Sequence, residues 1–368
     1  MSQNERESEN TMNFEEFLQQ MIDERASDVF VVAGLPVSYR AQGRQVRTDM
    51  PALRPADTER FVREIYRVAH RPIDKFLASD NHDEDFSFAL PGVGRFRANV
   101  FRQRGSLSAV VRVIPFGLPT PEQYHIPPEV LRVASLQKGL VLVTGPAGAG
   151  KSTTLACIID KLNHERTGHI ITMEDPIEYV HRHGSCIVTQ REIPTDVATY
   201  TEALRSAMRE APDVILLGEM RDADTISTAV TAGEMAQLIF STLHTTGAAG
   251  TVDRIIDAFP PSQQRQIRMQ LSMVLQAIVS QQLVPTVDGG VVPAFEIMFT
   301  NAAIRNLIRE EKTHQIDSVI AAGGEAGMRT MDQSLFDLVS AGIVAREVAL
   351  MYSIHQEALE KRLSAAGL

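Results

Sequence analysis

The sequence predicts an α/β protein with a parallel sheet wrapped by helices, preceded by a smaller α+β domain. From Glu129 onward, short hydrophobic stretches typical of buried strands alternate with helical stretches, at 140–144, 169–173, 214–217 and 237–241. A glycine-rich loop joins the first of these strands to a helix. Ahead of them, five prolines between Pro115 and Pro128 set off a segment with the alternating pattern of an antiparallel sheet.

The proline-rich stretch divides the chain into two predicted domains. Its proline density excludes regular structure and favours a stiff, extended linker, which we place at residues 115–128. Residues 1–11 are polar and charged and predict a disordered leader. Residues 12–114 then form the first domain and residues 129–368 the second.

The first domain is predicted to be a mixed α+β domain with an antiparallel sheet. An amphipathic helix opens it, with an apolar face of Phe14, Phe17, Leu18, Met21 and Ile22. Pro55 suits the first position of a second helix, which runs to about Ala69. Strands are predicted at 28–32, 85–90, 95–104 and 107–114, with a hairpin at 37–47 that turns at Gln42-Gly43.

Beyond Pro261 the chain is predicted to be mostly helical, with one hairpin that turns at Asp288-Gly289-Gly290. An apolar stripe at helical spacing predicts the buried face of a helix rather than a membrane contact. Its members are Ile267, Leu271, Val274, Leu275 and Ile278.

The composition is that of a soluble globular protein, with 44% hydrophobic and 22% charged residues among 368. No apolar run approaches the ~18–20 residues of a membrane-spanning helix. Two cysteines cannot form a disulfide framework, so we expect a reducing, cytoplasmic location. A net charge of −10 argues against a broad surface for nucleic acid, so no nucleic-acid partner is expected.

The loop from Gly145 to Ser152 matches the phosphate-binding pattern G-x-x-x-x-G-K-[ST] at every fixed position. Its glycines let consecutive backbone N–H groups face phosphate oxygens, backed by the positive end of the following helix. Lys151 is expected to reach the β- and γ-phosphates, and the Ser152 hydroxyl to hold Mg²⁺. The predicted nucleotide-binding residues are Gly145, Gly148, Ala149, Gly150, Lys151, Ser152 and Thr153.

Hydrolysis also requires a carboxylate to orient water and a ligand for Mg²⁺. Two acidic stretches follow predicted strands, at the edge where open α/β sheets bind ligands. One contains Glu174, Asp175 and Glu178; the other ends the strand at 214–217 with Gly218-Glu219. Gly218 stands where many P-loop enzymes have an aspartate, so this second match is atypical.

Two further polar clusters hold histidine. His244, just beyond the strand at 237–241, is a candidate to contact the γ-phosphate or the carboxylates. His181, His183 and Cys186 have metal-ligand side chains, but no fourth ligand is near, so a zinc site is not favoured. No Asn-Lys-x-Asp motif is present, which favours ATP over GTP.

These motifs resemble, in order and spacing, those of the secretion ATPases, and most closely the retraction ATPases of type IV pili, the PilT/PilU family. The similarity runs from about Asn13 to Tyr352, and Ala303–Glu310 resembles the C-terminal motif of that family. The resemblance implies a RecA-like P-loop NTPase core and an N-terminal PAS-like domain.

The resemblance also implies roles for site residues. Glu178 corresponds to the glutamate regarded as the general base, and Glu219 to the one that supports Mg²⁺ and its water. The family assembles as a homo-hexameric ring with each nucleotide at a subunit boundary, where arginines complete the site. The candidates are Arg97 and Arg112 on neighbouring strands of the first domain, and Arg205 and Arg209 on one face of a predicted helix. Surface pairing is the alternative for these arginines, for example with the acidic run of Asp80, Asp83, Glu84 and Asp85.

For the cell, the resemblance implies an ATPase at the inner face of the cytoplasmic membrane. It would convert ATP hydrolysis into movement of an inner-membrane, PilC-like platform protein, with a PilT/PilU paralogue as a further partner. In the helix 303–310, the charged residues Arg305, Arg309 and Glu310 are candidates for a coupling surface.

Several alternatives stay open at this point. The segment His183–Arg191 is closer to PilU than to PilT. One alternative function is therefore that of an accessory subunit, which binds ATP and scaffolds a mixed ring. A related secretion or pilus-assembly ATPase is a further alternative, although two cysteines exclude the tetracysteine site of the extension motor. A DNA-translocating motor is disfavoured by the acidic charge balance.

Overall fold

The computed structural model describes residues 13–41, 43–114 and 117–368. The predicted leader at 1–11, Gln42 of the first hairpin turn and Pro115 of the linker lie outside them. The described residues up to Gly117 form one compact unit, and those from Leu118 onward form a second. No helix among the described residues is long and apolar enough to cross a membrane.

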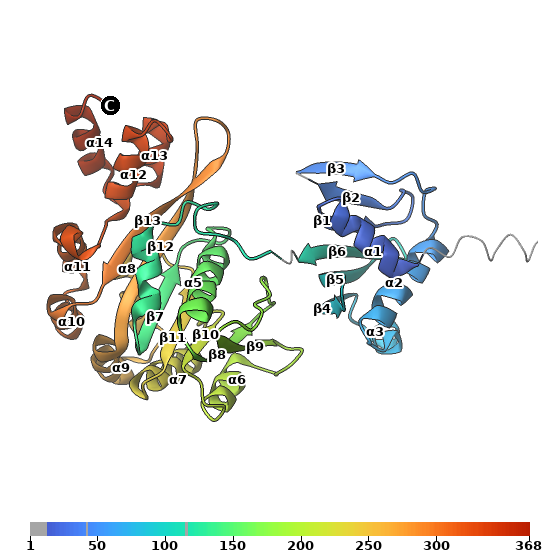
Figure 1. Cartoon of the computed structure of the whole chain (residues 1–368), viewed down its shortest axis with the longest axis horizontal. Coiled ribbons are helices and arrows are strands. Elements are labelled where there is room, and N and C mark those ends of the chain that lie inside the picture. Colours follow the sequence, from blue (N-terminus) through green and yellow to red (C-terminus); the bar gives the residue numbers. More distant parts are fainter. Residues whose placement is uncertain (1–12, 42, 115–116) are drawn as a thin grey trace, which may run out of the picture. The chain divides into compact units, whose positions relative to one another are not determined.

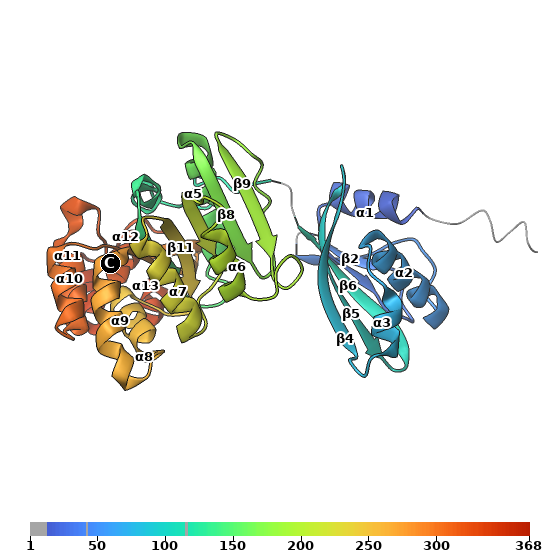
Figure 2. The ribbon, with the colours of Figure 1, turned by 90° about the horizontal axis from the view of Figure 1, so that it is seen from below.

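The first unit is an antiparallel sheet of six strands in the order β3-β2-β1-β6-β5-β4. Three helices cover one face of this sheet (Figure 2), and aromatic and aliphatic side chains of both layers form its core. The strands are Ala26–Val31 (β1), Ser38–Ala41 (β2), Arg44–Arg47 (β3), Asp83–Leu90 (β4), Gly94–Gln103 (β5) and Ser106–Ile114 (β6). The helices are Phe14–Asp23 (α1), Pro55–Val68 (α2) and Ile73–Ala78 (α3).

Local chemistry explains where the first two helices begin. The Asn13 side chain accepts a hydrogen bond from the Glu15 N–H at the start of α1. Pro55 is the first residue of α2, and the Asp57 carboxylate accepts from the Arg54 N–H at 2.9 Å. Both helices therefore start where the sequence predicts. The short helix α3 has no counterpart among the predicted elements.

The second unit contains a sheet of seven strands in the order β13-β12-β7-β11-β10-β8-β9. All neighbours run parallel except β12 and β13, which form an antiparallel hairpin. The strands are Gly139–Thr144 (β7), Gly168–Glu174 (β8), Cys186–Glu192 (β9), Val214–Leu217 (β10), Leu238–Leu243 (β11), Leu275–Pro285 (β12) and Val291–Phe299 (β13).

Helices pack on both faces of this sheet (Figure 1). The helices of this unit are Pro128–Leu131 (α4), Lys151–Glu165 (α5), Tyr200–Ala207 (α6), Ala223–Glu234 (α7), Ala248–Asp257 (α8), Pro261–Val274 (α9), Ala302–Arg309 (α10), Ile316–Ala322 (α11), Met331–Ser340 (α12), Arg346–Tyr352 (α13) and Gln356–Ala365 (α14). Short 3₁₀ helices lie at Arg132–Ser135, Thr313–Gln315 and Gly324–Ala326.

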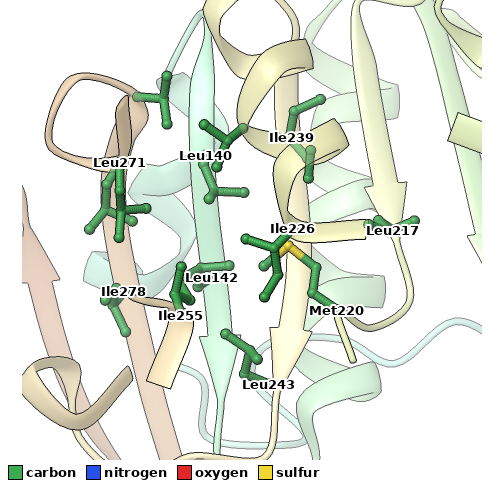
Figure 3. Close-up of a cluster of buried hydrophobic side chains, with 14 of the residues drawn as sticks. Leu140, Leu142, Leu217, Met220, Ile226, Ile239, Leu243, Ile255, Leu271 and Ile278 are labelled. Atoms are coloured by element: carbon green, nitrogen blue, oxygen red, sulfur yellow. The ribbon is translucent and has the colours of Figure 1, made fainter. Parts of the chain in front are cut away.

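The central strand β7 has both faces buried, which explains its continuous apolar sequence. Leu140 and Leu142 point into one core, with Ile226 of α7 and Leu271 of α9, as Figure 3 shows. Val141 and Val143 point into the opposite core, against α5. This two-sided burial fixes the strand that leads into the phosphate loop.

Two predicted elements are wrong. Leu275 and Ile278 were expected on a helix, but α9 ends at Val274 and both residues belong to strand β12. Their spacing of three suits a helix, yet a strand buried on both faces gives the same apolar run. Arg209 was expected on one helix with Arg205, but α6 ends at Ala207, and Arg209 lies in the turn beyond it. Strand β9 was not predicted at all.

Candidate nucleotide site

A cavity of about 390 Å³ opens where β7, β8, β10 and β11 end. Residues from several predicted motifs line it, including the phosphate loop, both acidic stretches and His244. From the loop these are Ala147, Gly148, Ala149, Gly150, Lys151, Ser152 and Thr153. Glu174, Glu178, Glu219 and His244 face the same cavity. Parallel strands place these loops together because their carboxyl ends meet at one edge of the sheet.

The glycines of the phosphate loop take backbone conformations that other residues rarely adopt. Gly150, the N-cap of α5, has a φ of 85°, and Gly148 has a φ of 74°. Gly145 has a φ of 144°, and a Cβ there would lie 2.2 Å from the carbonyl oxygen of Gln281 on β12. Gly145 is therefore needed for close packing against β12 as well as for the turn.

Lys151 is buried, with 9% of its surface exposed. Its ammonium donates to the carbonyl oxygens of Gly145 at 2.8 Å and Pro146 at 2.9 Å, closing the loop on itself. Burial lowers the pKa of Lys151, while the carboxylates of Glu219 and Glu178 partly offset that effect. The ammonium thus lies among phosphate-loop carbonyls and two acidic side chains, where it can compensate phosphate charge.

Ser152 lines the cavity beside Lys151, and Glu219 faces it from the end of β10. A hydroxyl and a carboxylate are hard oxygen donors, the type that Mg²⁺ takes alongside phosphate oxygens and water. Among the described residues, no three His, Cys, Asp or Glu side chains cluster as a complete metal site. Mg²⁺ usually keeps several water ligands, so the two oxygen donors of Ser152 and Glu219 suit it better than an ion that protein ligands surround completely.

The acidic stretch after β8 contributes two carboxyls with different surroundings. Glu174 accepts from the Thr172 hydroxyl at 2.7 Å and from the Gln190 amide at 3.2 Å. Burial away from water raises the pKa of Glu174 to about 7, although the two hydrogen bonds act to lower it. Glu178 is exposed at the cavity wall. Glu178 is therefore the more accessible carboxylate for a water molecule.

Glu219 is held by two basic groups. Its Oε1 pairs with the Arg221 guanidinium, and its Oε2 lies 3.3 Å from Nε2 of His244. Burial raises the pKa of Glu219, but the hydrogen bond and charge of Arg221, together with the contact to His244, outweigh it and hold the pKa below its ordinary value. The carboxylate is thus kept charged, as a ligand or anchor for a cation requires.

The structure explains the glycine that makes this strand end atypical. A Cβ at Gly218 would lie 2.8 Å from the hydroxyl of Tyr200 and 3.1 Å from the carbonyl oxygen of Met173. The Thr242 hydroxyl also donates to the Gly218 carbonyl at 2.7 Å. Position 218 has no room for a carboxylate, so the charge at this strand end is carried by Glu219.

Of the four predicted arginines, Arg205 and Arg209 belong to the unit that holds this cavity, and neither lines it. Arg205 and Arg209 are exposed, and the Arg209 guanidinium donates to the Arg205 carbonyl at 3.0 Å. In the first unit, Arg97 and Arg112 lie directly opposite each other on β5 and β6. Arg97 pairs with Asp85, one of the acidic residues named above as partners in the surface-pairing alternative. Arg112 pairs with Asp28 at 2.9 Å. Their roles at a subunit boundary stay predictions.

Two of the three candidate metal ligands on and near β9 make hydrogen bonds elsewhere. The His183 ring accepts from the Val188 N–H at 3.0 Å, and the Cys186 thiol donates to the Arg166 carbonyl at 3.2 Å. His181 is buried, which lowers its pKa to about 4 and keeps it neutral near pH 7.

Sequence patterns missed several residues that shape the site. Tyr179 hydrogen bonds to Thr153 at 3.0 Å, and Tyr200 packs on Gly218. The Gln281 amide donates to the carbonyl of Ala149, 132 positions away in the chain. No motif marks such residues, although a polar Gln281 inside an apolar strand was a signal that could have been noted.

Comparison with known proteins places this site in a family. Residues 105–347 match the family described as Type II/IV secretion system protein. The type IV pilus retraction ATPase PilT of Pseudomonas aeruginosa is 45% identical over 92% of this chain and 97% of its own. A twitching motility protein of Neisseria gonorrhoeae is 44% identical over 87% of this chain and 85% of its own. PilU of Pseudomonas aeruginosa is 38% identical over 93% and 89%.

A solved structure supports the same placement. The crystal structure of the pilus retraction motor PilT with bound ADP has a TM-score of 0.86, with 43% identity, and covers 95% of this chain and 99% of that one. The higher identity to PilT than to PilU favours the PilT branch over the accessory alternative. The chain therefore belongs to the type II/IV secretion system protein family, within its branch of type IV pilus retraction ATPases.

Proposed function

We propose that this chain hydrolyses ATP in the cavity beyond β7, β8, β10 and β11, and that the reaction drives pilus retraction. The observation that carries the proposal is the meeting of Lys151, Glu178, Glu219 and His244 in one cavity with the phosphate loop. Each of these side chains comes from a different loop, and each has chemistry that phosphoryl transfer requires.

The residues divide the work as follows. The phosphate loop and Lys151 hold the phosphates, and the buried ammonium compensates charge that grows on the γ-phosphoryl group. Glu178 orients the attacking water and accepts its proton. Ser152 and Glu219 would hold Mg²⁺, which when bound neutralises charge between the β- and γ-phosphates. His244 keeps Glu219 in place through their contact at 3.3 Å.

We further propose a homo-hexameric ring that acts at the cytoplasmic face of the inner membrane. Arg205, Arg209, Arg97 and Arg112 are the arginines proposed for the subunit boundary. Arg205 and Arg209 lie outside the lining of the cavity in their own unit, which suits residues supplied to a neighbour's site. A PilC-like platform protein is the proposed membrane partner and a PilU-type paralogue a second one. The support for both is that relatives of this chain, PilT and PilU, are named as type IV pilus ATPases.

Glu178→Gln tests the chemical part of the proposal. The amide keeps the size of the side chain but cannot accept the proton, so ATP binding should persist while hydrolysis falls by at least ~10²-fold. Binding is followed with a fluorescent ATP analogue, and hydrolysis by phosphate release. Equal loss of binding and turnover would make Glu178 structural and move the base to Glu174 or Glu219. A wild-type protein that binds ATP without hydrolysing it would favour the accessory alternative.

A further inference from the structure

The segment that carries His244 is fastened to the sheet at its far end. Gly247, three residues after His244, has a φ of 80°, which turns its own N–H and that of Ala248 toward the hairpin strands β12 and β13. The Gly247 N–H donates to the Ser280 hydroxyl at 2.9 Å, and the Ala248 N–H donates to Oε1 of Glu296 at 2.7 Å. Two consecutive backbone donors thus have dedicated acceptors.

These acceptors replace the cap that α8 lacks. Gly247 occupies the N-cap position and offers no side chain, so the first N–H groups of α8 need partners from elsewhere. Ser280 and Glu296 supply them as directly opposed residues of β12 and β13. The Glu296 carboxyl oxygen accepts there as the side chain of an N-cap residue would.

Both acceptors are deeply buried, with 0% of Ser280 and 2% of Glu296 exposed. A buried carboxyl destabilises the fold unless its hydrogen bonds are made, so the position of Glu296 beneath α8 calls for a structural explanation. Neither residue belongs to a nucleotide motif, and neither lines the nucleotide cavity. The backbone of Ser280 pairs with that of Thr144 on β7, just before the phosphate loop. The side chains of Ser280 and Glu296 instead bond to the start of α8, a few residues from His244.

Within that stretch the chain is tied again to α8. The Thr251 hydroxyl donates to the Gly247 carbonyl at 2.6 Å and hydrogen bonds to the Thr245 hydroxyl at 2.7 Å. His244 itself is exposed; it faces the cavity, and its Nε2 lies 3.3 Å from Oε2 of Glu219. Its position therefore depends on how firmly the segment 244–248 is held, because its own side chain has little packing.

We propose that Ser280 and Glu296 are positioning residues for ATP hydrolysis, acting by holding the start of α8 so that His244 meets Glu219. The inference rests on the proposed function and adds two residues, on the last two strands of the sheet, to the machinery of that site. Loss of either acceptor leaves a buried N–H without a partner and lets residues 244–248 shift.

Ser280→Ala is the direct test. It should lower kcat by about 10-fold or more, since a misplacement of ~1 Å near the chemistry costs up to ~10²-fold. The KM for ATP and the affinity for ADP should change less than about 2-fold, because the phosphate loop is untouched.

Ser334→Ala is the matched control. Ser334 is also a buried serine whose hydroxyl accepts a backbone N–H, that of Phe295, at 3.1 Å, but it lies on α12. The same chemical loss there should leave kcat near the wild-type value. If both serine variants lower kcat equally, the effect is general destabilisation and the inference is wrong.

Glu296 gives a second, independent comparison. Glu296→Gln keeps an oxygen acceptor for the Ala248 N–H and should retain most of kcat, whereas Glu296→Met fills the space without an acceptor and should lose it. Equal activity of the two variants would overturn the role of Glu296. Lys151→Ala is measured in parallel, since full hydrolysis in that variant would defeat the proposed function itself rather than this inference.

Discussion

At the scale of single residues, the site depends on charges kept in place by burial and pairing. Lys151 is enclosed by carbonyl oxygens of its own loop, and Glu219 is charged because two basic groups flank it. These arrangements explain why the residues of the motif have to be Lys and Glu rather than any polar side chain.

Lys151→Ala should cut turnover by at least ~10²-fold, because it removes the charge that stabilises the transferred γ-phosphoryl group. Steady-state phosphate release by the purified protein measures the loss. Lys138, which precedes β7 and does not line the cavity, is the control, and Lys138→Ala should leave turnover unchanged. Near-normal hydrolysis by Lys151→Ala would contradict the assignment of the nucleotide site.

The motif residues could be predicted from the sequence because their pattern is local. Gly150, Lys151 and Ser152 are neighbours in the chain, and their chemistry follows from that alone. The contacts of Gly145 with Gln281, and of Gly218 with Tyr200, join residues far apart in sequence. Such pairs depend on the packed fold, so no periodicity or spacing could reveal them.

At the scale of elements, strands β9 and β12 were the hardest to predict. β12 carries apolar residues at helical spacing, and β9 mixes polar and apolar residues at the sheet edge. Helices with a clear cap or an initial proline, such as α2, were predicted within a residue or two. Tertiary burial, rather than local propensity, decided the difficult cases.

Helix α10 carries one arginine that bonds to a neighbouring helix and one that is exposed. Arg305 donates to the carbonyl oxygens of Ser272 and Met273, both at 2.7 Å, near the end of α9. Arg309 is exposed, and within the described residues no hydrogen bond or ion pair of its side chain is recorded. The coupling surface expected on this helix therefore rests on Arg309 more than on Arg305.

Arg305→Ala should lower the free energy of unfolding by about 1.5–3 kcal/mol, the range for hydrogen bonds to a charged group. Arg309→Ala should leave both stability and ATP hydrolysis unchanged but impair pilus retraction. Thermal unfolding, phosphate release and a motility assay distinguish the two variants. If Arg309→Ala loses hydrolysis and motility in proportion, α10 is not a coupling surface.

The cap of α8 should make stability depend on pH. Burial raises the pKa of Glu296 to about 7, and Asp317 of α11 and Asp332 of α12 add to that rise. With His355, these are the titratable groups that line the 250 Å³ cavity beside it. A raised pKa means that the neutral carboxyl is favoured in the fold, so its stabilising contribution is complete below about 4.5 and lost as pH rises through about 7.

Glu296→Gln cannot ionise and should escape that loss. Its free energy of unfolding, relative to wild type, should therefore increase between pH 5 and pH 8, as measured by urea denaturation. Glu325→Gln, at an exposed surface position, should show no such trend. A difference between Glu296→Gln and wild type that does not vary with pH would contradict a carboxyl that titrates near neutrality.

At the scale of the whole molecule, the proposed ring makes activity a property of the assembly. If Arg205 completes a neighbour's site, hydrolysis per subunit must rise with protein concentration as rings form. Arg205→Ala should depress hydrolysis without unfolding the chain, because charge in the transition state is left uncompensated.

Mixing Arg205→Ala with Lys151→Ala protein should partly restore hydrolysis, because some interfaces then pair an intact phosphate loop with an intact arginine. A mixture of Arg309→Ala with Lys151→Ala protein, in the same proportions, is the control for dilution of active subunits by inactive ones. Hydrolysis that is independent of concentration, with no gain on mixing, would defeat the ring.

The most direct test of the central claim is pilus retraction in a strain that lacks its own copy of this gene. Deletion should stop retraction, and wild-type protein should restore it. Glu178→Gln, supplied at the same protein level, should not restore it, because it binds ATP without hydrolysing it. Retraction that survives the deletion, or that Glu178→Gln restores, would contradict a motor driven by hydrolysis in this cavity.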